Sequence, residues 1–556
     1  MRKMCKIQVM LRNFSSFDRI LLAVIILAFF LRIFGITYGL PLPLVDDEQT
    51  FTYAALKMLE LKTLLPILHP EIFSVILYYP PYLSYLYLVP FVLITGFEYL
   101  TWGGEASLFT SHLLSNLSPF FITARLVSII LGTASVFLIY KTAESLFRSR
   151  VAALASAFLL ATSVVHIALS MVARHWLPAS FVFALILYIL TRESLNEERR
   201  YFWSMIVAGI GMGISMIMPL YLAFVGTWYL TAGNIPLRDL FKSRLLWIGG
   251  FLYVGLSLLP FLLHAKSDGI TPDMTYEAQK SIASFLMIPF TTFSYTLFSE
   301  PVLTLFAILG VVLAYRAHRA FTLSAICFFF VYTVALFFVF RFESRFLLPL
   351  TLLYALFGGY VVLWFWESAW GKYFICVLLC IPLFAAVQLS ALATIDDTRA
   401  LAREWAQQHI PAQERILVAA RLTRLPASKD AVQELRTIDP NALRRADTAD
   451  EVLNAPNSYH ALNLFTIEKD DFYSTLPAYA RKNQYRYLIY SPTFLDGSPE
   501  AVAAFEALTK NATLLASWKG LNDDYSIAYS AFRPWSNALF TNEYLGPSIE
   551  IYRLND

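Results

Sequence analysis

Three consecutive acidic residues, Asp46, Asp47 and Glu48, are the part of this chain best suited to chemistry. They come directly after the first long apolar stretch and its Pro-Leu-Pro-Leu-Val tail. A carboxylate held close to a low-dielectric interface can act as a general base or position a hydroxyl nucleophile. The same acids also suit a plain structural role, because Asp47 could cap a helix expected over 49–61. The residue types alone leave both interpretations open.

Basic side chains recur at the ends of several apolar stretches, and they suggest an anion site. The candidates are Arg125, the Arg174-His175 pair, and Arg341 and Arg345 on either side of Glu343. An arginine can bind a phosphate through two parallel hydrogen bonds, or it can simply extend its charge to the membrane surface. Arg341 and Arg345 could also form a structural ion pair with Glu343. Several such groups on one face could together hold a lipid phosphate at headgroup level.

Neither the histidines nor the cysteines indicate a metal site. His69 and His175 stand alone, and the sequence has no H-x-x-H spacing and no C-x-x-C pair. A divalent cation that bridges the acidic cluster to a pyrophosphate is a weakly supported alternative. We therefore predict that no metal and no cofactor is required. The net charge of +3 gives no sign of a nucleic-acid partner.

The elements that must position these residues are membrane helices. Of the 556 residues, 58% are hydrophobic and 15% charged, and the mean hydropathy is +0.57. A soluble domain usually carries about a quarter charged residues, so this is the composition of an integral membrane protein. The apolar run 20–40 is longer than a signal-peptide core and no A-x-A-like site follows it, which predicts an uncleaved first span.

A bilayer core requires about 20 apolar residues per helix, and the chain offers about 11 such stretches. They are 20–40, 121–140, 151–170, 177–191, 202–218, 219–232, 245–263, 298–315, 320–340, 346–364 and 373–392. The loops after alternate stretches hold most of the Lys and Arg residues. The positive-inside rule places these loops, and the N-terminus, in the cytoplasm. The protein then lies in the inner or plasma membrane.

Residues 41–120 are predicted to form one large external loop. The segment from Pro80 to Gly96 is apolar enough to be a span, but counting it as one would move every later basic cluster outside. We therefore expect a helix that lies at the membrane surface. The transmembrane part, with this loop, covers residues 1–394.

Residues 395–556 have a different character, because short alternating runs stand between polar stretches. Examples are Arg415-Ile-Leu-Val-Ala and Ser548-Ile-Glu-Ile-Tyr, and a helical pattern covers 398–409. This predicts a small α/β domain. The span count places it outside the cell, on the same side as the loop 41–120.

Four motifs together resemble the GT-C superfamily of membrane glycosyltransferases, in the branch of the protein O-mannosyltransferases and lipid A aminoarabinose transferases. The resemblance extends over residues 15–390. The motifs are Asp47-Glu48-x-x-x-x-Tyr-Ala-Ala-Leu, Tyr79-Pro80-Pro81-Tyr-Leu, Thr123-Ala-Arg125-Leu-Val and Arg345-Phe-Leu-Leu-Pro349. The C-terminal patterns that begin at Asp397 and Gly546 also look like the external domain of prokaryotic members.

The resemblance implies an inverting transfer of a sugar from a polyprenyl or dolichyl phosphate to an acceptor protein, lipid or glycan. Asp47 would be the catalytic carboxylate, with Asp46 in reserve and Glu48 as the third candidate. The lipid phosphate would be held by basic and polar groups at Arg345, Arg174, Arg125, His175, Tyr79 and Arg341.

The chain departs from the family pattern at two places. Relatives often carry Lys or His where this chain has Tyr79, and an acidic residue where Ala179 follows Pro178. A two-acid or metal-dependent mechanism is therefore less favoured.

Two competing interpretations are a transporter or flippase of polyprenyl-linked sugars and an inactive scaffold of the same fold. A flippase would place charges in the middle of spans, whereas here they cluster at span ends.

Overall fold

The structure is a computed structural model, and it divides into two compact units. The first unit comprises residues 1–37, 45–391 and 531–536, and the second comprises 38–44, 392–530 and 537–556. The structure describes residues 16–42, 44–45, 48–77, 79–232, 242–264, 282–339, 344–412, 414–421, 423, 425–439, 459–467, 470–492, 499–520, 540 and 543–555.

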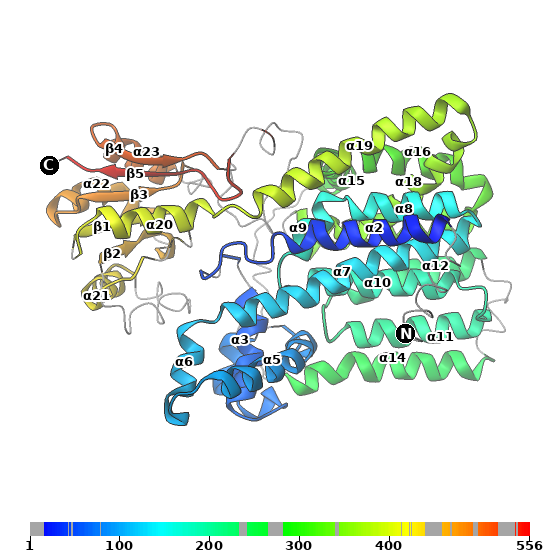
Figure 1. Ribbon diagram of the computed structural model, residues 1–556, viewed down its shortest axis with the longest axis horizontal. Helices are drawn as coiled ribbons and strands as arrows, with labels where there is room; N and C mark the ends of the chain where they lie inside the picture. The colour runs from blue at the N-terminus through cyan, green and yellow to red at the C-terminus, as the bar shows by residue number, and fades with distance from the viewer. Residues whose placement is uncertain are drawn as a thin grey trace, which may run out of the picture. The chain divides into compact units, whose positions relative to one another are not determined.

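The first unit is a bundle of long apolar helices (Figure 1). Its first part contains α2 (Ser16–Ile33), α3 (Glu48–Glu60), η1 (Pro66–Leu68), α4 (Pro70–Ile76), α5 (Tyr82–Thr101), η2 (Ala106–Leu108), α6 (Phe109–Ser115), α7 (Ser118–Phe147), α8 (Arg150–Ala161), α9 (Val164–Ser170) and α10 (Trp176–Thr191). It continues with α11 (Glu197–Gly211), α12 (Met218–Ala232), α14 (Arg244–Leu263), α15 (Ile282–Ser299), α16 (Pro301–Ala317), α17 (Arg319–Val339), η3 (Ser344–Leu347), α18 (Leu348–Trp366) and α19 (Ala369–Leu392).

Among the described residues, five helices are long and apolar enough to cross a membrane, or six if one bent pair is counted as a span. They are Tyr82–Thr101, Ser118–Phe147, Arg244–Leu263, Arg345–Trp366 and Ala369–Leu392, with the bent pair Arg150–Ala161 and Val164–Ser170. At 1.5 Å per residue, the 30 residues of α7 extend about 45 Å, well beyond a bilayer core of about 30 Å. The predicted count of about 11 is thus not confirmed, since several other apolar helices are shorter.

Two features of the bundle differ from the sequence prediction. The predicted single span 151–170 is broken into α8 and α9, which meet at an angle of 57°. The break is local in origin, because Ser163 caps α9 by accepting a hydrogen bond from the backbone N–H of His166. The second difference is α15, a helix that the sequence reading omitted. Pro289 lies inside this helix and is a helix-breaking signal in the sequence.

The loop 41–120 contains α3, α4, α5 and α6, which Figure 1 shows grouped at one end of the bundle. One face of α5 is buried through Leu83, Tyr87 and Phe91, whereas Leu93 and Leu100 on other faces are exposed. By length and composition α5 qualifies as a span, although the charge rule predicts a helix at the membrane surface. An exposed apolar face suits contact with lipid in either position.

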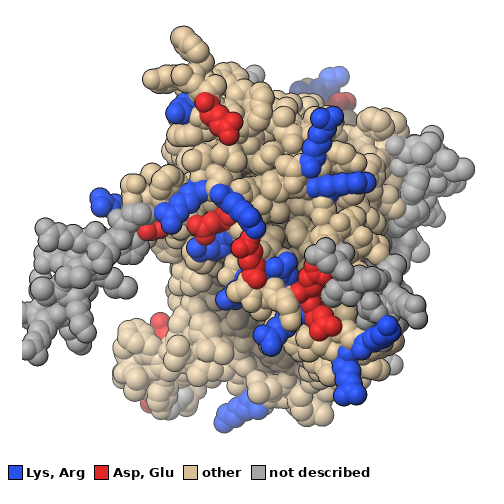
Figure 2. Space-filling view, turned by 90° about the vertical axis from the view of Figure 1, so that its right-hand side faces the viewer, with Lys and Arg blue, Asp and Glu red and all other residues tan. Residues whose placement is uncertain are grey.

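Charged side chains mark one end of the bundle. At one end Arg148 bonds Glu193 at 2.9 Å, and the Arg150 guanidinium lies over the Phe17 ring at 5.8 Å. These contacts bring together the start of α2 and the connections that follow α7 and α10. Figure 2 faces this end and shows Lys and Arg side chains gathered on it, with acidic groups between them. We call it the basic end.

The second unit is built around a five-stranded sheet with the strand order β2-β1-β3-β5-β4. The strands are β1 (Arg415–Ala419), β2 (His460–Asn463), β3 (Tyr487–Tyr490), β4 (Thr513–Trp518) and β5 (Ile549–Arg553). β1 pairs in parallel with β2 and β3, whereas β5 is antiparallel to β3 and β4. The other elements are α20 (Thr398–His409), α21 (Lys429–Ile438), η6 (Leu464–Thr466), α22 (Asp470–Lys482) and α23 (Pro499–Thr509).

Helices cover both faces of this sheet, because successive side chains of a strand point to opposite faces. In β1, Ile416 and Val418 join a core with Ala402 and Ala406 of α20. The alternate residue Leu417 joins a second core built from α21, α22 and α23. A strand that is apolar on both faces is typical of the parallel centre of an α/β sheet.

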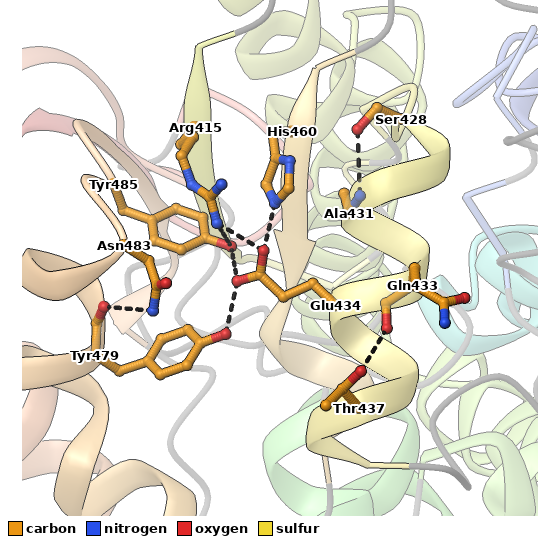
Figure 3. A network of polar contacts seen from close by, with 10 residues as sticks. All are labelled: Arg415, Ser428, Ala431, Gln433, Glu434, Thr437, His460, Tyr479, Asn483 and Tyr485. Carbon is orange, nitrogen blue, oxygen red and sulfur yellow. Dashed lines mark hydrogen bonds and ion pairs between the residues drawn. The ribbon is translucent and has the colours of Figure 1, made fainter.

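A carboxylate links α21 to its neighbours in this unit (Figure 3). Glu434 accepts hydrogen bonds from Arg415 at 2.6 Å, His460 at 2.5 Å, and Tyr479 and Tyr485 at 2.6 Å each. Burial alone would raise the pKa of Glu434, but the four surrounding groups outweigh burial and lower its pKa to about 2. Glu434 therefore remains an anion that joins α21 to two strands and to α22.

Candidate active site

A buried ion pair fixes the end of the acidic cluster. Glu48, the first residue of α3, accepts hydrogen bonds of 2.7 Å from both Nε and Nη2 of Arg125 in α7. The backbone N–H of Ala173 donates to the same carboxylate at 2.8 Å, and Nη1 of Arg125 donates to the Ile36 carbonyl at 2.9 Å. Both side chains are fully buried. Two parallel charge-assisted bonds are the strongest form of such a contact.

This pairing changes the expected roles of two predicted site residues. The guanidinium of Arg125 has two of its nitrogens bonded to Glu48, so the geometry argues against Arg125 as a ligand of lipid phosphate. The carboxylate of Glu48 is likewise engaged and buried, which argues against it as the catalytic base. The other two acids, Asp46 and Asp47, lie outside the described residues, so their assignment stays a prediction.

The Arg174-His175 pair follows α9 and is almost completely buried. The His175 ring lies 4.5 Å from the Tyr79 ring and 4.5 Å from the Trp176 ring, measured between centroids. Phe51 of α3 is 5.6 Å from His175 and stacks on Tyr79 at 5.3 Å. The predicted residues Tyr79 and His175 therefore touch each other, although they are far apart in the sequence.

Arg345 reaches the same group of rings from the start of α18. Its guanidinium lies 5.4 Å from the centroid of Trp176 and 5.2 Å from that of Phe346. Such cation–π contacts orient an arginine without neutralising its charge. The neighbouring prediction, Arg341, lies outside the described residues, as does Glu343.

A continuous series of contacts thus runs from α3 to Arg345 through Tyr79, His175 and Trp176. We call this group the aromatic–basic cluster; its members are Phe51, Tyr79, Arg174, His175, Trp176, Arg345 and Phe346. Sequence reasoning identified its charged members and Tyr79 but not Trp176, Phe51 or Phe346. The one available signal was that Trp176 directly follows Arg174-His175. The other two rings are brought near by tertiary packing.

The break between α8 and α9, which leads into this cluster, has a buried charge on each side. Arg32 of α2 donates to the carbonyls of Leu160 and Ala161 at the end of α8, at 3.2 and 3.1 Å. Glu300 accepts from Ser163 Oγ at 2.6 Å and from the backbone N–H of Val165 at 2.9 Å, at the start of α9. A cation at a helix C-terminus and an anion at an N-terminus both complement the helix dipole. The broken helix is therefore capped on both sides.

An apolar cavity of about 280 Å³ lies among α15, α16, α17 and α18. Its wall is almost entirely hydrocarbon and includes Ala307, Ala325, Leu350 and Phe357. Leu350 stands five positions after Arg345 along the start of α18. The backbone of Arg345 is therefore within about two helical turns of one wall of the cavity.

The described residues contain no group of three or more His, Cys, Asp and Glu side chains that could hold a metal ion. Asp46 and Asp47 lie outside the described residues. The expectation that no metal is needed stays a prediction.

Residues 112–264 match the family described as dolichyl-phosphate-mannose-protein mannosyltransferase. No match was found among curated protein sequences. The matched part contains α7 and the Arg174-His175 pair, and so includes much of the aromatic–basic cluster.

Three solved structures are distantly similar. ArnT from Cupriavidus metallidurans bound to undecaprenyl phosphate is 12% identical over 97% of this chain and 98% of that chain, with a TM-score of 0.49. The oligosaccharyltransferase AglB from Archaeoglobus fulgidus, in complex with an inhibitory peptide and a dolichol-phosphate, is 12% identical over 86% and 70%, with a TM-score of 0.47. The arabinofuranosyltransferase AftD from Mycobacteria is 14% identical over 81% and 35%, with a TM-score of 0.26. At this distance the likenesses do not bear on individual residues.

The matched residues include the motif around Arg125, whereas the motifs at Asp47, Tyr79 and Arg345 lie outside them. Over residues 112–264, the chain resembles the dolichyl-phosphate-mannose-protein mannosyltransferases.

Proposed function

We propose that this protein transfers a sugar from a polyprenyl- or dolichyl-phosphate donor to an acceptor on the extracytoplasmic face of the membrane. The observation that carries the proposal is the contact series of the aromatic–basic cluster, which joins α3 to Arg345, five positions before the cavity residue Leu350. Such a site offers one place for an anionic headgroup and another for a hydrocarbon chain.

Arg345 is the proposed primary ligand of the donor phosphate. Its contacts with Trp176 and Phe346 hold the guanidinium in place, and a guanidinium can bind a phosphate through two parallel hydrogen bonds. Arg174 and His175 add basic groups next to it, and Tyr79 packs on the His175 ring. Arg341 is proposed as a further ligand from its sequence position alone.

The apolar cavity is the proposed place for the first isoprene units of the donor. Its lining is hydrocarbon and it starts close to Arg345, so a lipid phosphate at Arg345 would direct its chain along α16 and α18. Burial of apolar surface is the expected driving force for such a chain.

Asp47 is the proposed general base, with Asp46 as the second candidate. The carboxylate takes the proton of the acceptor hydroxyl or amine as that group attacks the anomeric carbon. The bond from this carbon to the phosphate oxygen breaks with inversion, and the lipid phosphate leaves with the electron pair. The basic groups stabilise the charge that develops on the phosphate. No metal or cofactor is part of the proposal.

The proposed side of the membrane rests on charge. The basic end of the bundle carries the Lys and Arg residues in Figure 2, and by the positive-inside rule this supports a cytoplasmic position for it. α7 runs from Ser118, close to the Glu48–Arg125 pair, to Phe147 at the basic end. The proposed site therefore faces away from the cytoplasm. The cytoplasmic N-terminus, the count of about 11 spans and the extracytoplasmic α/β domain belong to the same proposal.

The transporter interpretation is not favoured. The family match is to transferases, and the buried charges of the described helices bond to helix ends or to each other. Arg32 bonds backbone carbonyls and Glu300 bonds the start of α9. A flipping path would instead require charges free to contact a moving headgroup.

The test compares a deletion strain with its parent by mass spectrometry of membrane glycans and glycolipids. Loss of one glycosylated product, restored by the wild-type chain, supports the transferase. The Asp47→Asn variant should restore no product and still bind undecaprenyl phosphate, whereas Asp46→Asn should retain activity. A product restored fully by Asp47→Asn and lost with Asp46→Asn would move the base to Asp46. An unchanged glycan profile in the deletion strain would refute the proposed function.

A further inference from the structure

A second buried ion pair stands at the start of α20 in the C-terminal unit. Asp397 accepts hydrogen bonds from the backbone N–H of Arg399 at 2.9 Å, from its Nε at 2.7 Å and from its Nη2 at 2.8 Å. Both side chains are fully buried. Burial alone would raise the pKa of Asp397, but the Arg399 charge and the hydrogen bonds lower it below its usual value. This carboxylate is a permanent anion.

The fourth donor to Asp397 comes from far away in the sequence. The Tyr38 hydroxyl donates to Oδ2 of Asp397. Nη1 of Arg399 also makes a long contact of 3.5 Å with the carbonyl of Leu44. The segment Tyr38–Leu44 accordingly belongs to the same compact unit as α20 and the sheet, although it follows the first helix of the chain.

The segment is folded tightly against itself. Gly39 has a φ of +74°, a conformation that favours glycine. A Cβ at Gly39 would lie 3.0 Å from Cβ of Leu44, so no other side chain fits without displacing Leu44. Leu44 and the next residue, Val45, are fully buried. Leu44 therefore packs closely against Gly39, and its carbonyl faces the guanidinium of Arg399.

The C-terminal end of the chain closes over the same pair. Thr398 Oγ1 donates to the carbonyl of Pro547 at 2.7 Å. A Cβ at Gly546 would lie 2.7 Å from Oδ1 of Asp397, so glycine is required there. Pro547 leads directly into β5. The pair is therefore built into the sheet domain itself.

We infer that Tyr38, Asp397 and Arg399 are positioning residues for the acidic cluster, a role that rests on the proposed function. Leu44 is held by this anchor on one side of Asp46 and Asp47, and Glu48 is held by Arg125 on the other. In the sequence, the two candidate bases therefore stand between residues that are each held by a buried arginine–carboxylate pair. In this proposal the C-terminal unit contributes to turnover by placing the base.

The size of the effect follows from the demands of proton transfer. A general base must lie within hydrogen-bond reach of its proton, and a misplacement of about 1 Å can reduce turnover by about 100-fold. The donor phosphate is bound by other residues in this scheme. Loss of the anchor should therefore reduce turnover and leave donor binding unchanged.

The test uses Tyr38→Phe in the full-length protein, because this change removes one hydroxyl and keeps the ring. Amide hydrogen exchange over residues 36–45 should become faster. The amount of glycosylated product should fall at least about tenfold at equal protein level, while the affinity for undecaprenyl phosphate changes less than about twofold. Gly546→Ala, which crowds Asp397 from the other side, should have the same signature.

The matched control is Glu434→Gln, which loosens the same unit at a network that does not include residues 38–44. It should leave both exchange over 36–45 and product formation near wild type. Unchanged exchange in Tyr38→Phe would overturn the anchor, and faster exchange with full product formation would overturn its role in turnover. An equal loss of product in Glu434→Gln would show that the loss in Tyr38→Phe comes from lower stability of the whole unit and not from the anchor. A wild-type chain that transfers no sugar would overturn the proposed function. The hydrogen-exchange data would in that case still show whether the Tyr38 contact holds residues 36–45 in place.

Discussion

Glu48 and Arg125 are joined by two hydrogen bonds of 2.7 Å, and neither side chain is accessible to solvent. The pair fixes the first residue of α3 against α7 and against the backbone of Ala173. Arg125 was expected to bind the lipid phosphate, but it holds Glu48, the residue that follows Asp47 in the sequence. Removal of one partner would leave a buried charge without its counter-ion.

Arg125→Gln should therefore lower the free energy of unfolding by about 3–5 kcal/mol, because it leaves the Glu48 carboxylate buried and uncompensated. Thermal or denaturant unfolding of the detergent-solubilised protein measures this. Lys57→Gln is the control, since it removes a solvent-exposed ion pair with Glu60 in the same helix α3. Exposed pairs contribute less than about 1 kcal/mol. Equal losses in the two variants would contradict the assigned role of the buried pair.

Arg345→Gln should weaken binding of undecaprenyl phosphate by about 10- to 100-fold, because hydrogen bonds to a charged group contribute about 1.5–3 kcal/mol. The measurement is a titration with the lipid in detergent. Arg316→Gln, at the exposed end of α16, removes the same charge at the basic end and should leave the affinity unchanged. Retained affinity in Arg345→Gln would exclude this residue as the main phosphate ligand.

Ala307→Phe should narrow the apolar cavity and so discriminate between lipids by length. Undecaprenyl phosphate should bind at least about tenfold more weakly, whereas a short-chain prenyl phosphate should be affected little, because only the long chain needs the cavity. Leu305→Phe is the matched control, since residue 305 lies on the exposed face of the same helix. Equal weakening of both lipids would indicate a distorted headgroup site and would argue against the cavity as the chain site.

Glu434 gives the C-terminal unit an acid-dependent stability. Its pKa is lowered from 4.5 to about 2 in the folded protein. The stabilisation is therefore complete above pH 4.5 and is lost as the pH falls from about 4.5 towards 2. After allowance for solvent screening it is about 1–2 kcal/mol. The unfolding temperature should fall across this range in the wild type, and Glu434→Gln should abolish this part of the fall. If Glu434→Gln showed the same pH dependence as the wild type, the fall in unfolding temperature at low pH would come from other groups.

Much of the architecture follows from the sequence because its signals are local. The helices α10 (Trp176–Thr191) and α20 (Thr398–His409) lie where the apolar and amphipathic patterns predict them. β1 coincides with the run Arg415–Ala419. The basic residues Arg174, His175 and Arg345 were grouped from their positions at the ends of apolar stretches, whereas Tyr79 was added only through the family resemblance, since no local pattern links it to them.

The features that sequence reasoning missed arise from tertiary contacts. Arg125 resembles a phosphate ligand until the fold places Glu48 against it, 77 positions earlier in the chain. The break in 151–170 has a weak local signal in Thr162-Ser163, but the charges that stabilise it come from α2 and α16. The membership of Tyr38–Leu44 in the C-terminal unit has no sequence signal.

Arg32 also bears on how the chain is made. This arginine lies in the first described helix, and two of its carbonyl partners are 128 and 129 positions further along the chain. Until α8 has been synthesised and inserted, those carbonyls cannot solvate the guanidinium, and a charge in hydrocarbon is costly. We therefore expect α2 to stay beside the insertion machinery, or in contact with water, until α8 arrives. The pairing of α2 with α8 is therefore expected to be an early step in the assembly of the bundle.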